Sequence, residues 1–155
     1  MFKYKVVIVL VLLIIFNILL LIFLSSNNKV SKPVKTLTPV DPDFKGEDHI
    51  AFVMFYTKWC KYSKMALPDF TSFKEWVDNE KKGKLDEYNI EALMIDVEEP
   101  NLSDREKKIL EHAKPMIDGY PTLLTYVGNP RLQAYKYNGD RTKEAYISNI
   151  ESYAS

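Results

Sequence analysis

The chain has 155 residues, of which 46% are hydrophobic and 27% charged, and its formal net charge at pH 7 is zero. This length leaves room for one domain, and ten Tyr and eight Phe can fill a core, which excludes a wholly disordered chain. The charge is uneven. Residues 1–40 hold five Lys and no acid, whereas residues 41–155 hold 16 basic against 21 acidic residues, a net charge of −5. We therefore expect no nucleic-acid partner for the folded part.

Cysteine and histidine are scarce in this sequence. The single cysteine, Cys60, excludes an internal disulfide framework and a Cys-rich zinc site. With only His49 and His112, a His-based metal site is not expected either. We predict neither a bound metal nor a cofactor, and chemistry at the one thiol stays open.

The first apolar segment is long enough to cross a membrane. Residues 6–24 are apolar except for Asn17, and a helix of this length spans a hydrocarbon core of about 30 Å. The alternative is a cleaved secretory signal peptide, but its apolar region is usually shorter, roughly 7–15 residues. Leu24-Ser25-Ser26 is also a poor cleavage site. We predict an uncleaved transmembrane signal-anchor after a short leader at residues 1–5.

The charges around this segment give its expected orientation. Two Lys precede it and three follow it, so the positive-inside count is close to a tie. The short leader and its adjacent Lys pair favour a single-pass protein whose C-terminal domain lies on the non-cytosolic side. That side is a secretory compartment lumen, the cell surface or a virion envelope. Residues 25–48 are polar and hold three prolines, which predicts a tether, and residues 49–155 form the domain.

Strand and helix patterns alternate from residue 49 onward. The compact apolar run at residues 49–57 predicts a buried strand. After Cys60, apolar residues recur at helical spacings of four, three and four, and Pro68 should kink this helix. The residues with that spacing are Ala66, Phe70, Phe73 and Val77. Residues 78–88 are charged and contain a glycine, so they are predicted as a solvated helix end or loop.

The second half of the domain continues the alternation. Residues 90–97 predict a second strand, and Ser103-x-x-Glu106 is a capping box that begins a second helix. Residues 122–127 predict a third strand. A turn leads to a fourth strand at residues 131–137, where alternating polarity predicts one solvated face.

A last helix closes the predicted fold. Thr142 is its expected N-cap, and Tyr146, Ile147 and Ile150 are its expected inward residues. The order β-α-β-α-β-β-α predicts an α/β domain with a central mixed sheet flanked by helices.

Cys60 occupies an unusual position. It lies where the first strand gives way to the first helix, next to Trp59. A lone Cys is most often a buried small hydrophobe, but the N–H groups and positive end of a helix dipole favour a thiolate. Lys58, Lys61 and Lys64 add positive charge, although they also suit a solvated helix start. The position predicts a nucleophilic cysteine.

Four segments, in order, resemble those of a known family. Residues 55–64 read Phe-Tyr-Thr-Lys-Trp-Cys-Lys-Tyr-Ser-Lys, Pro68 follows, residues 119–122 read Gly-Tyr-Pro-Thr, and residues 137–141 read Tyr-Asn-Gly-Asp-Arg. They resemble the active-site segment, helix proline, cis-proline turn and final turn of thioredoxin-like proteins, particularly protein disulfide isomerase domains. The resemblance covers roughly residues 48–155 and implies a thioredoxin-like fold.

Three departures from the family pattern change the expected chemistry. Ser63 replaces the second active-site Cys, so the motif is the monothiol form Cys-x-x-Ser. Met54 replaces the family's buried acid, and the spacing from Cys60 to Pro121 is longer than usual. The first two departures are consistent, because that acid helps to move the proton of the resolving thiol. The family's N-terminal strand and helix also look absent or reduced.

The resemblance implies a role for each site residue. Cys60 would form a mixed disulfide that only an external thiol can resolve, and Ser63 would donate a hydrogen bond to its thiolate. Pro121 in cis would present the backbone of Tyr120 to an extended client, with Trp59 part of the same surface. The implied partners are cysteine-containing client proteins or glutathione.

Two other readings stay open, and with them whether the protein is an enzyme. A peroxidase is one, because Thr57-x-x-Cys60 has the peroxiredoxin spacing, although Val53 stands where those enzymes have Pro. The other is a redox-inactive interaction or structural membrane module, since a fold does not settle function.

Overall fold

The computed structural model describes residues 44, 48–80, 83–128 and 132–154. The chain divides into two units, Met1–Val30 and Ser31–Ser155, and every described residue belongs to the second. The leader and transmembrane segment predicted from the sequence lie outside the described residues, as does most of the predicted tether. Within the described part of the chain, no helix combines the length and apolar character needed to span a bilayer.

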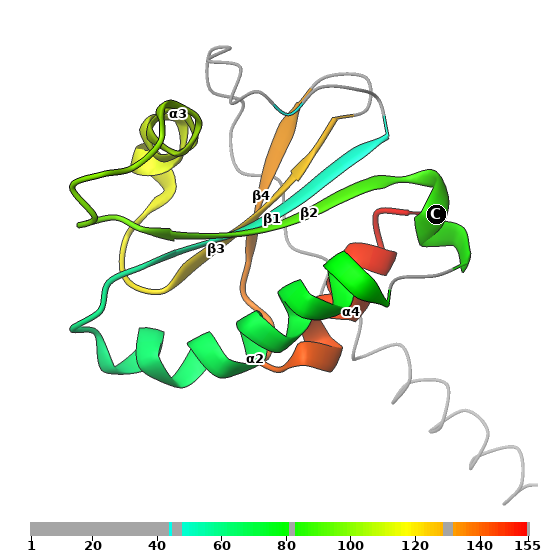
Figure 1. Ribbon diagram of the computed structural model, residues 1–155, viewed down its shortest axis with the longest axis horizontal. Coiled ribbons are helices and arrows are strands. Elements are labelled where there is room, and N and C mark those ends of the chain that lie inside the picture. The colour runs from blue at the N-terminus through cyan, green and yellow to red at the C-terminus, as the bar shows by residue number, and fades with distance from the viewer. Residues whose placement is uncertain (1–43, 45–47, 81–82, 129–131, 155) are drawn as a thin grey trace, which may run out of the picture. The chain divides into compact units, whose positions relative to one another are not determined.

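Four strands form one mixed sheet in the order β2-β1-β3-β4 (Figure 1). The central strand β1 (His49–Tyr56) pairs in parallel with β2 (Asn89–Asp96) and antiparallel with β3 (Thr122–Val127). The last strand, β4 (Gln133–Tyr137), is antiparallel to β3. A strand with neighbours on both edges and helices on both faces has little contact with water, which explains why β1 is apolar along most of its length.

The helices cover both faces of this sheet (Figure 1). One face packs against α2 (Lys61–Asn79) and α4 (Lys143–Glu151), and the other against α3 (Asp104–Ala113). Two short 3-10 helices, η1 (Gly83–Glu87) and η2 (Lys114–Met116), complete the regular structure of the described residues. This is the predicted α/β architecture of a central mixed sheet flanked by helices.

Alternate side chains of β1 divide the core into two clusters. Those facing α2 and α4 are Ile50, Phe52 and Met54. Those on the α3 side are Ala51, Val53 and Phe55. Phe52 is the centre of an aromatic group, with ring centroids 5.4–5.6 Å from those of Phe70, Phe73, Tyr137 and Tyr146.

The predicted order of elements is confirmed, with small shifts at two strands. β2 begins and ends one residue before the predicted range of 90–97, and β4 begins at Gln133. Both predicted N-caps are present, because Ser103 and Thr142 each accept a hydrogen bond from a backbone N–H three residues later, at 3.3 Å. The Ser103 cap is a complete capping box.

The prediction of a solvated helix end or loop at residues 78–88 is confirmed at the helix end, where residues 78–80 are exposed, and is wrong at the 3-10 helix that follows. α2 continues to Asn79, and η1 follows. Gly83 has a φ of +75°, a left-handed conformation that a residue without Cβ adopts readily. Two residues later, Leu85 is buried against the α2 side of the core. Leu85, with the half-buried Tyr88, attaches an otherwise charged connection to the core.

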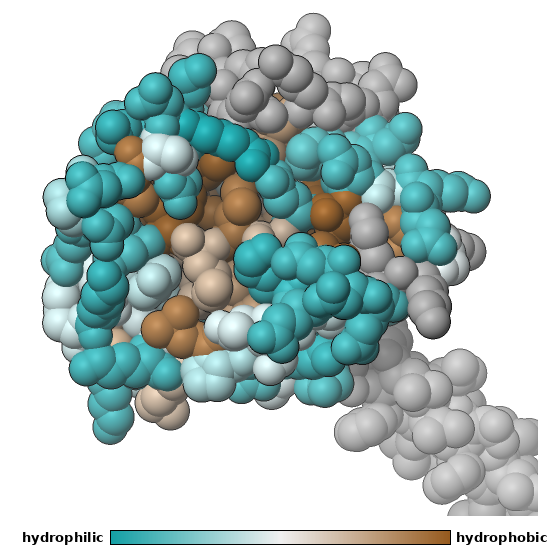
Figure 2. All heavy atoms as spheres, in the orientation of Figure 1, coloured by the Kyte–Doolittle hydropathy of each residue, from teal (hydrophilic) through white to brown (hydrophobic). Residues whose placement is uncertain are grey.

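Hydrophobic side chains also reach the surface along one edge of the sheet. β2 is an edge strand among the described residues, and Leu93 and Met94 on it are half-buried. Figure 2 shows hydrophobic side chains gathered in the middle of the face of the molecule that it draws, with hydrophilic side chains around them.

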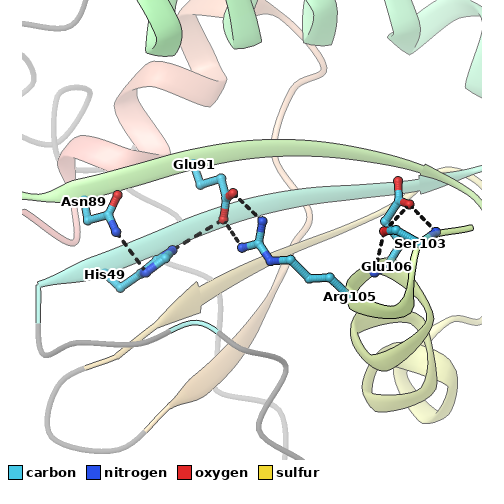
Figure 3. A network of polar contacts seen from close by, with 6 residues as sticks. All are labelled: His49, Asn89, Glu91, Ser103, Arg105 and Glu106. Carbon is cyan, nitrogen blue, oxygen red and sulfur yellow. Dashed lines mark hydrogen bonds and ion pairs between the residues drawn. The ribbon is translucent and has the colours of Figure 1, made fainter.

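A polar network joins β1, β2 and α3 (Figure 3). The two terminal guanidinium nitrogens of Arg105 donate to the carboxylate of Glu91, at 2.6 and 2.5 Å, and Nε2 of His49 lies 3.5 Å from the same carboxylate. Asn89 contacts the other ring nitrogen of His49 at 3.3 Å. The hydrogen bond from His49 and the adjacent Arg105 lower the pKa of Glu91 to about 2, although partial burial opposes this.

We expect this network to make the fold sensitive to acid. The folded pKa of Glu91, about 2, lies below the ordinary value of 4.5. Its stabilisation is therefore complete above the ordinary value and lost as the pH falls towards the folded value. Glu91→Gln should lower the free energy of unfolding by about 2 kcal/mol near neutral pH and by much less near pH 2.

Urea denaturation of the full-length chain in detergent at several pH values measures this effect. The control is Glu111→Gln, which removes an exposed carboxylate on α3. A loss for Glu91→Gln that does not change with pH would contradict a contribution from its ionised form.

Candidate functional site

The site begins at the junction between β1 and α2. Cys60 is the N-cap residue of α2, with extended backbone angles (φ −69°, ψ 122°). At an N-cap, the first N–H groups of the helix have no partner within the helix and can point at the capping side chain. Cys60 is a free cysteine, and the residue is 9% exposed.

These surroundings favour the ionised sulfur. The backbone N–H of Ser63 is the largest cause of a pKa of Cys60 below its ordinary value, and burial opposes it. The Ser63 hydroxyl, the N–H of Tyr62 and the charge of Arg141 lower the pKa further. A thiolate is the nucleophilic form of cysteine, so the arrangement supports thiol chemistry.

The turn before β3 lies against this sulfur. The Tyr120–Pro121 peptide bond is cis, the form that the resemblance implies. The Cys60 thiol donates a hydrogen bond to the carbonyl oxygen of Tyr120, at 3.2 Å. The fold thus brings Cys60, Tyr120 and Pro121 together although 60 residues separate the first two. Only the protonated thiol makes this hydrogen bond, so ionisation frees the Tyr120 carbonyl.

The two substituted family positions are both buried. Ser63 is fully buried, and its hydroxyl has no hydrogen-bond partner in the described part of the chain. The Cys60 thiolate, whose pKa this hydroxyl lowers, is therefore its natural acceptor. Met54 is fully buried in the core cluster that includes residues of α2. A thioether cannot carry a proton to or from sulfur at neutral pH.

Lys58 does not have the role expected of it. Its Nζ lies 3.1 Å from Asp96 Oδ2 and 3.2 Å from Glu99 Oε2. Two carboxylates therefore offset its charge, and the prediction that Lys58 adds a positive field at Cys60 was wrong. The cation that lowers the pKa of Cys60 is Arg141, in the turn before α4.

An exposed apolar surface adjoins Cys60. Trp59, Tyr62 and Met65 are the large hydrophobic residues most exposed in the described part of the chain, at 63–65%. The indole of Trp59 donates to Glu98 Oε1 at 2.8 Å and lies edge-on to the Tyr120 ring. Trp59 was predicted to belong to a client surface. Tyr62 and Met65 were missed, although their spacing of three puts them on one face of the first turns of α2.

Comparison with known proteins agrees with this geometry. No family model matches the sequence. A candidate protein disulfide-isomerase of Schizosaccharomyces pombe is 27% identical over 103 residues, which are 66% of this chain and 17% of that protein. The first two thioredoxin domains of Naumovozyma dairenensis Eps1p match with a TM-score of 0.51 at 21% identity, over 82% of this chain and 42% of theirs. The fold is thioredoxin-like.

A second solved structure supports the same fold. Human ERp44 matches with a TM-score of 0.50 at 21% identity, over 79% of this chain and 29% of that protein. The chain therefore spans less than half of each of these three proteins. Within the thioredoxin-like domain, Cys60 is the single cysteine, in a monothiol Cys-x-x-Ser motif.

A hollow of about 350 Å³ lies beside the cis-proline turn of the thioredoxin-like domain. Its lining includes Tyr120, Pro121, Lys136 and Arg141. Among the described residues, no group of three His, Cys, Asp or Glu side chains could hold a metal ion. The chemistry available at this site is that of the thiol, hydrogen bonds and fixed charges.

Proposed function

We propose that the protein is a membrane-anchored thioredoxin-like protein that carries out monothiol thiol–disulfide exchange at Cys60. The observation that supports this proposal is the position of the Cys60 sulfur. It lies at the amino end of α2, 3.2 Å from the carbonyl oxygen of Tyr120, and the pKa of this thiol is lowered. The likeness to a candidate protein disulfide-isomerase supports the same class of chemistry. Its partners would be cysteine-containing client proteins or glutathione.

The exchange has two steps, and neither changes the total number of disulfides. The Cys60 thiolate attacks one sulfur of a disulfide, whose S–S bond breaks as the mixed disulfide forms, and the second sulfur leaves as a thiolate. An external thiolate then attacks the mixed disulfide and expels Cys60. The N–H and hydroxyl of Ser63, which favour the Cys60 thiolate, favour it as leaving group too.

The surface beside the thiol suits a peptide client. Trp59, Tyr62 and Met65 offer apolar contact, and exposed aromatic residues are common in binding surfaces. The backbone of Tyr120, next to the cis-proline, can pair with an extended segment once its carbonyl no longer accepts from the thiol. This binding mode depends more on main chain than on sequence.

A redox-inactive interaction module is the second candidate. The exposed apolar surface would serve such a module equally well, and Ser63 and Met54 replace the two groups that internal resolution needs. In that case Cys60 would stay a thiol throughout the protein's life.

Trapping of mixed disulfides separates the two candidates. Full-length protein in detergent is incubated with glutathione disulfide or an unfolded disulfide-containing protein, quenched with acid and run on non-reducing gels. Exchange predicts adducts in the wild type and none in Cys60→Ser, since Cys60 is the only cysteine. Equal patterns in the two forms would refute exchange and leave the interaction module.

We also propose that residues 6–24 anchor the protein and place the thioredoxin-like domain on the non-cytosolic side. The length and apolar character of this segment support the proposal. The protein should stay in the membrane pellet after alkaline carbonate extraction, at unreduced size. Release by carbonate, or a mature amino terminus near Ser26, would show a cleaved signal instead.

A further inference from the structure

The hollow beside the cis-proline turn is suited to a small ligand attached to Cys60. Its volume of about 350 Å³ falls within the usual range of ligand sites, roughly 300–1,000 Å³. One wall is Tyr120, whose carbonyl oxygen lies 3.2 Å from the Cys60 sulfur. Cys60 is not among the lining residues, but its sulfur contacts one of them, so a group of several bonds joined to this sulfur can extend into the hollow.

The two cationic residues that line the hollow, Lys136 and Arg141, differ in their hydrogen bonds and ion pairs. Lys136 forms an ion pair with Asp118 and donates to the carbonyl oxygen of Met116 at 3.4 Å. Arg141 is exposed and has neither a hydrogen bond nor an ion pair within the described part of the chain. Its charge nevertheless acts on Cys60. Arg141 is thus the cation that remains available to a ligand.

We infer that Arg141 anchors a carboxylate and that the hollow selects small anionic disulfides whose carboxylates lie several bonds from the sulfur, such as glutathione disulfide. A guanidinium binds a carboxylate through two parallel hydrogen bonds, which fixes the orientation of the ligand as well as attracting it. The inference rests on the proposed exchange at Cys60 and names the substrate class of that site.

The reaction needs no further reactant. The Cys60 thiolate attacks one sulfur of glutathione disulfide, a new S–S bond joins Cys60 to one glutathionyl group, and the other glutathione leaves as a thiolate with the electron pair of the broken bond. The resulting mixed disulfide has no S–H. The Tyr120 carbonyl therefore loses its donor and can accept a hydrogen bond from an amide N–H of the bound tripeptide.

Three small disulfides of different charge test the anchor. Glutathione disulfide is anionic, bis(2-hydroxyethyl) disulfide is neutral and cystamine is cationic. The rate constant for adduct formation at Cys60 is measured by mass spectrometry for full-length wild type and Arg141→Gln. The matched control is Lys108→Gln, which removes an exposed positive charge from α3, on the other face of the sheet.

The test uses the ratio of rate constants, because any change in the pKa of Cys60 affects all three reactions alike. Arg141→Gln should lower the rate with glutathione disulfide, relative to the neutral disulfide, roughly fivefold. The cystamine rate should rise relative to the neutral one. In Lys108→Gln, all ratios should stay close to those of the wild type.

The outcomes separate the inference from the proposed function. Equal ratios in wild type and Arg141→Gln, with adducts formed in both, would overturn the anchor and leave exchange intact. Equal loss of the glutathione preference in Lys108→Gln would show a general charge effect and would also overturn it. Absence of adducts with all three disulfides in the wild type would refute exchange itself.

Discussion

Replacing Ser63 by Cys should shorten the lifetime of mixed disulfides at Cys60 about 100-fold when external thiol is scarce. In the wild type, the buried Ser63 hydroxyl beside Cys60 cannot attack a disulfide, so an adduct waits for a thiol from solution. A thiol at position 63 would act at an effective concentration of order mM, about 100 times that of external thiol at 10 μM.

The pH dependence of this gain follows from Met54. Because no carboxylate occupies the buried position six residues before Cys60, the new thiol must ionise without a nearby base. Its resolution rate should therefore rise with pH until the pKa of the new thiol is reached. Preformed glutathione adducts, followed by mass spectrometry over time, provide the measurement.

Ser63→Ala is the matched control for this experiment. It removes the hydroxyl, which favours Cys60 as leaving group, without adding a nucleophile, so adducts should persist at least as long as in the wild type. Equal lifetimes in wild type and Ser63→Cys would refute control of resolution by position 63, but not exchange at Cys60.

Replacing Phe52 by Ala should cost about 3–5 kcal/mol of unfolding free energy, the usual range for a buried Phe. Phe52 is fully buried at the centre of the sheet, and its ring lies within 5.6 Å of the rings of Phe70, Phe73, Tyr137 and Tyr146. These partners come from α2, β4 and α4. One truncation therefore loosens three elements at once, and it leaves a cavity that rigid neighbours fill poorly.

Urea denaturation of the full-length chain in detergent measures this loss. Tyr62→Ala is the control, because it also removes an aromatic ring but from a side chain that is 63% exposed, and it should change stability by less than about 0.5 kcal/mol. If Phe52→Ala does not fold, Phe52→Leu should still show a loss of about 1 kcal/mol. Similar values for the Phe52 and Tyr62 variants would contradict this account of the core.

Local patterns were sufficient to predict most of the fold. Capping residues and apolar periodicity fixed the order of the elements, because each signal lies within a few residues of the structure it specifies. At residues 78–88 the solvated helix end was predicted, but the burial of Leu85 in the following 3-10 helix was not, because a charged sequence surrounds it. Burial of a single residue depends on the tertiary structure, which periodicity does not describe.

The candidate site was likewise predicted in part. Cys60 and the Gly-Tyr-Pro-Thr turn carry sequence motifs, so their proximity could be predicted. The neutralisation of Lys58 could not, because Asp96 and Glu99 reach it from the end of β2 and the loop that follows. Arg141 belonged to a recognised motif, yet its electrostatic effect on Cys60 depends on the packing of the turn before α4.

The length of β1 has a consequence for how two ionisable sites of the domain affect each other. His49 is the first residue of β1, and Cys60 lies four residues beyond its last residue, Tyr56. Eight residues of strand extend roughly 25 Å. The polar network around His49 therefore stands at one end of this strand and the thiol near the other. Across such a span charges are largely screened by salt, so the acid sensitivity of the fold and the reactivity of Cys60 can change independently.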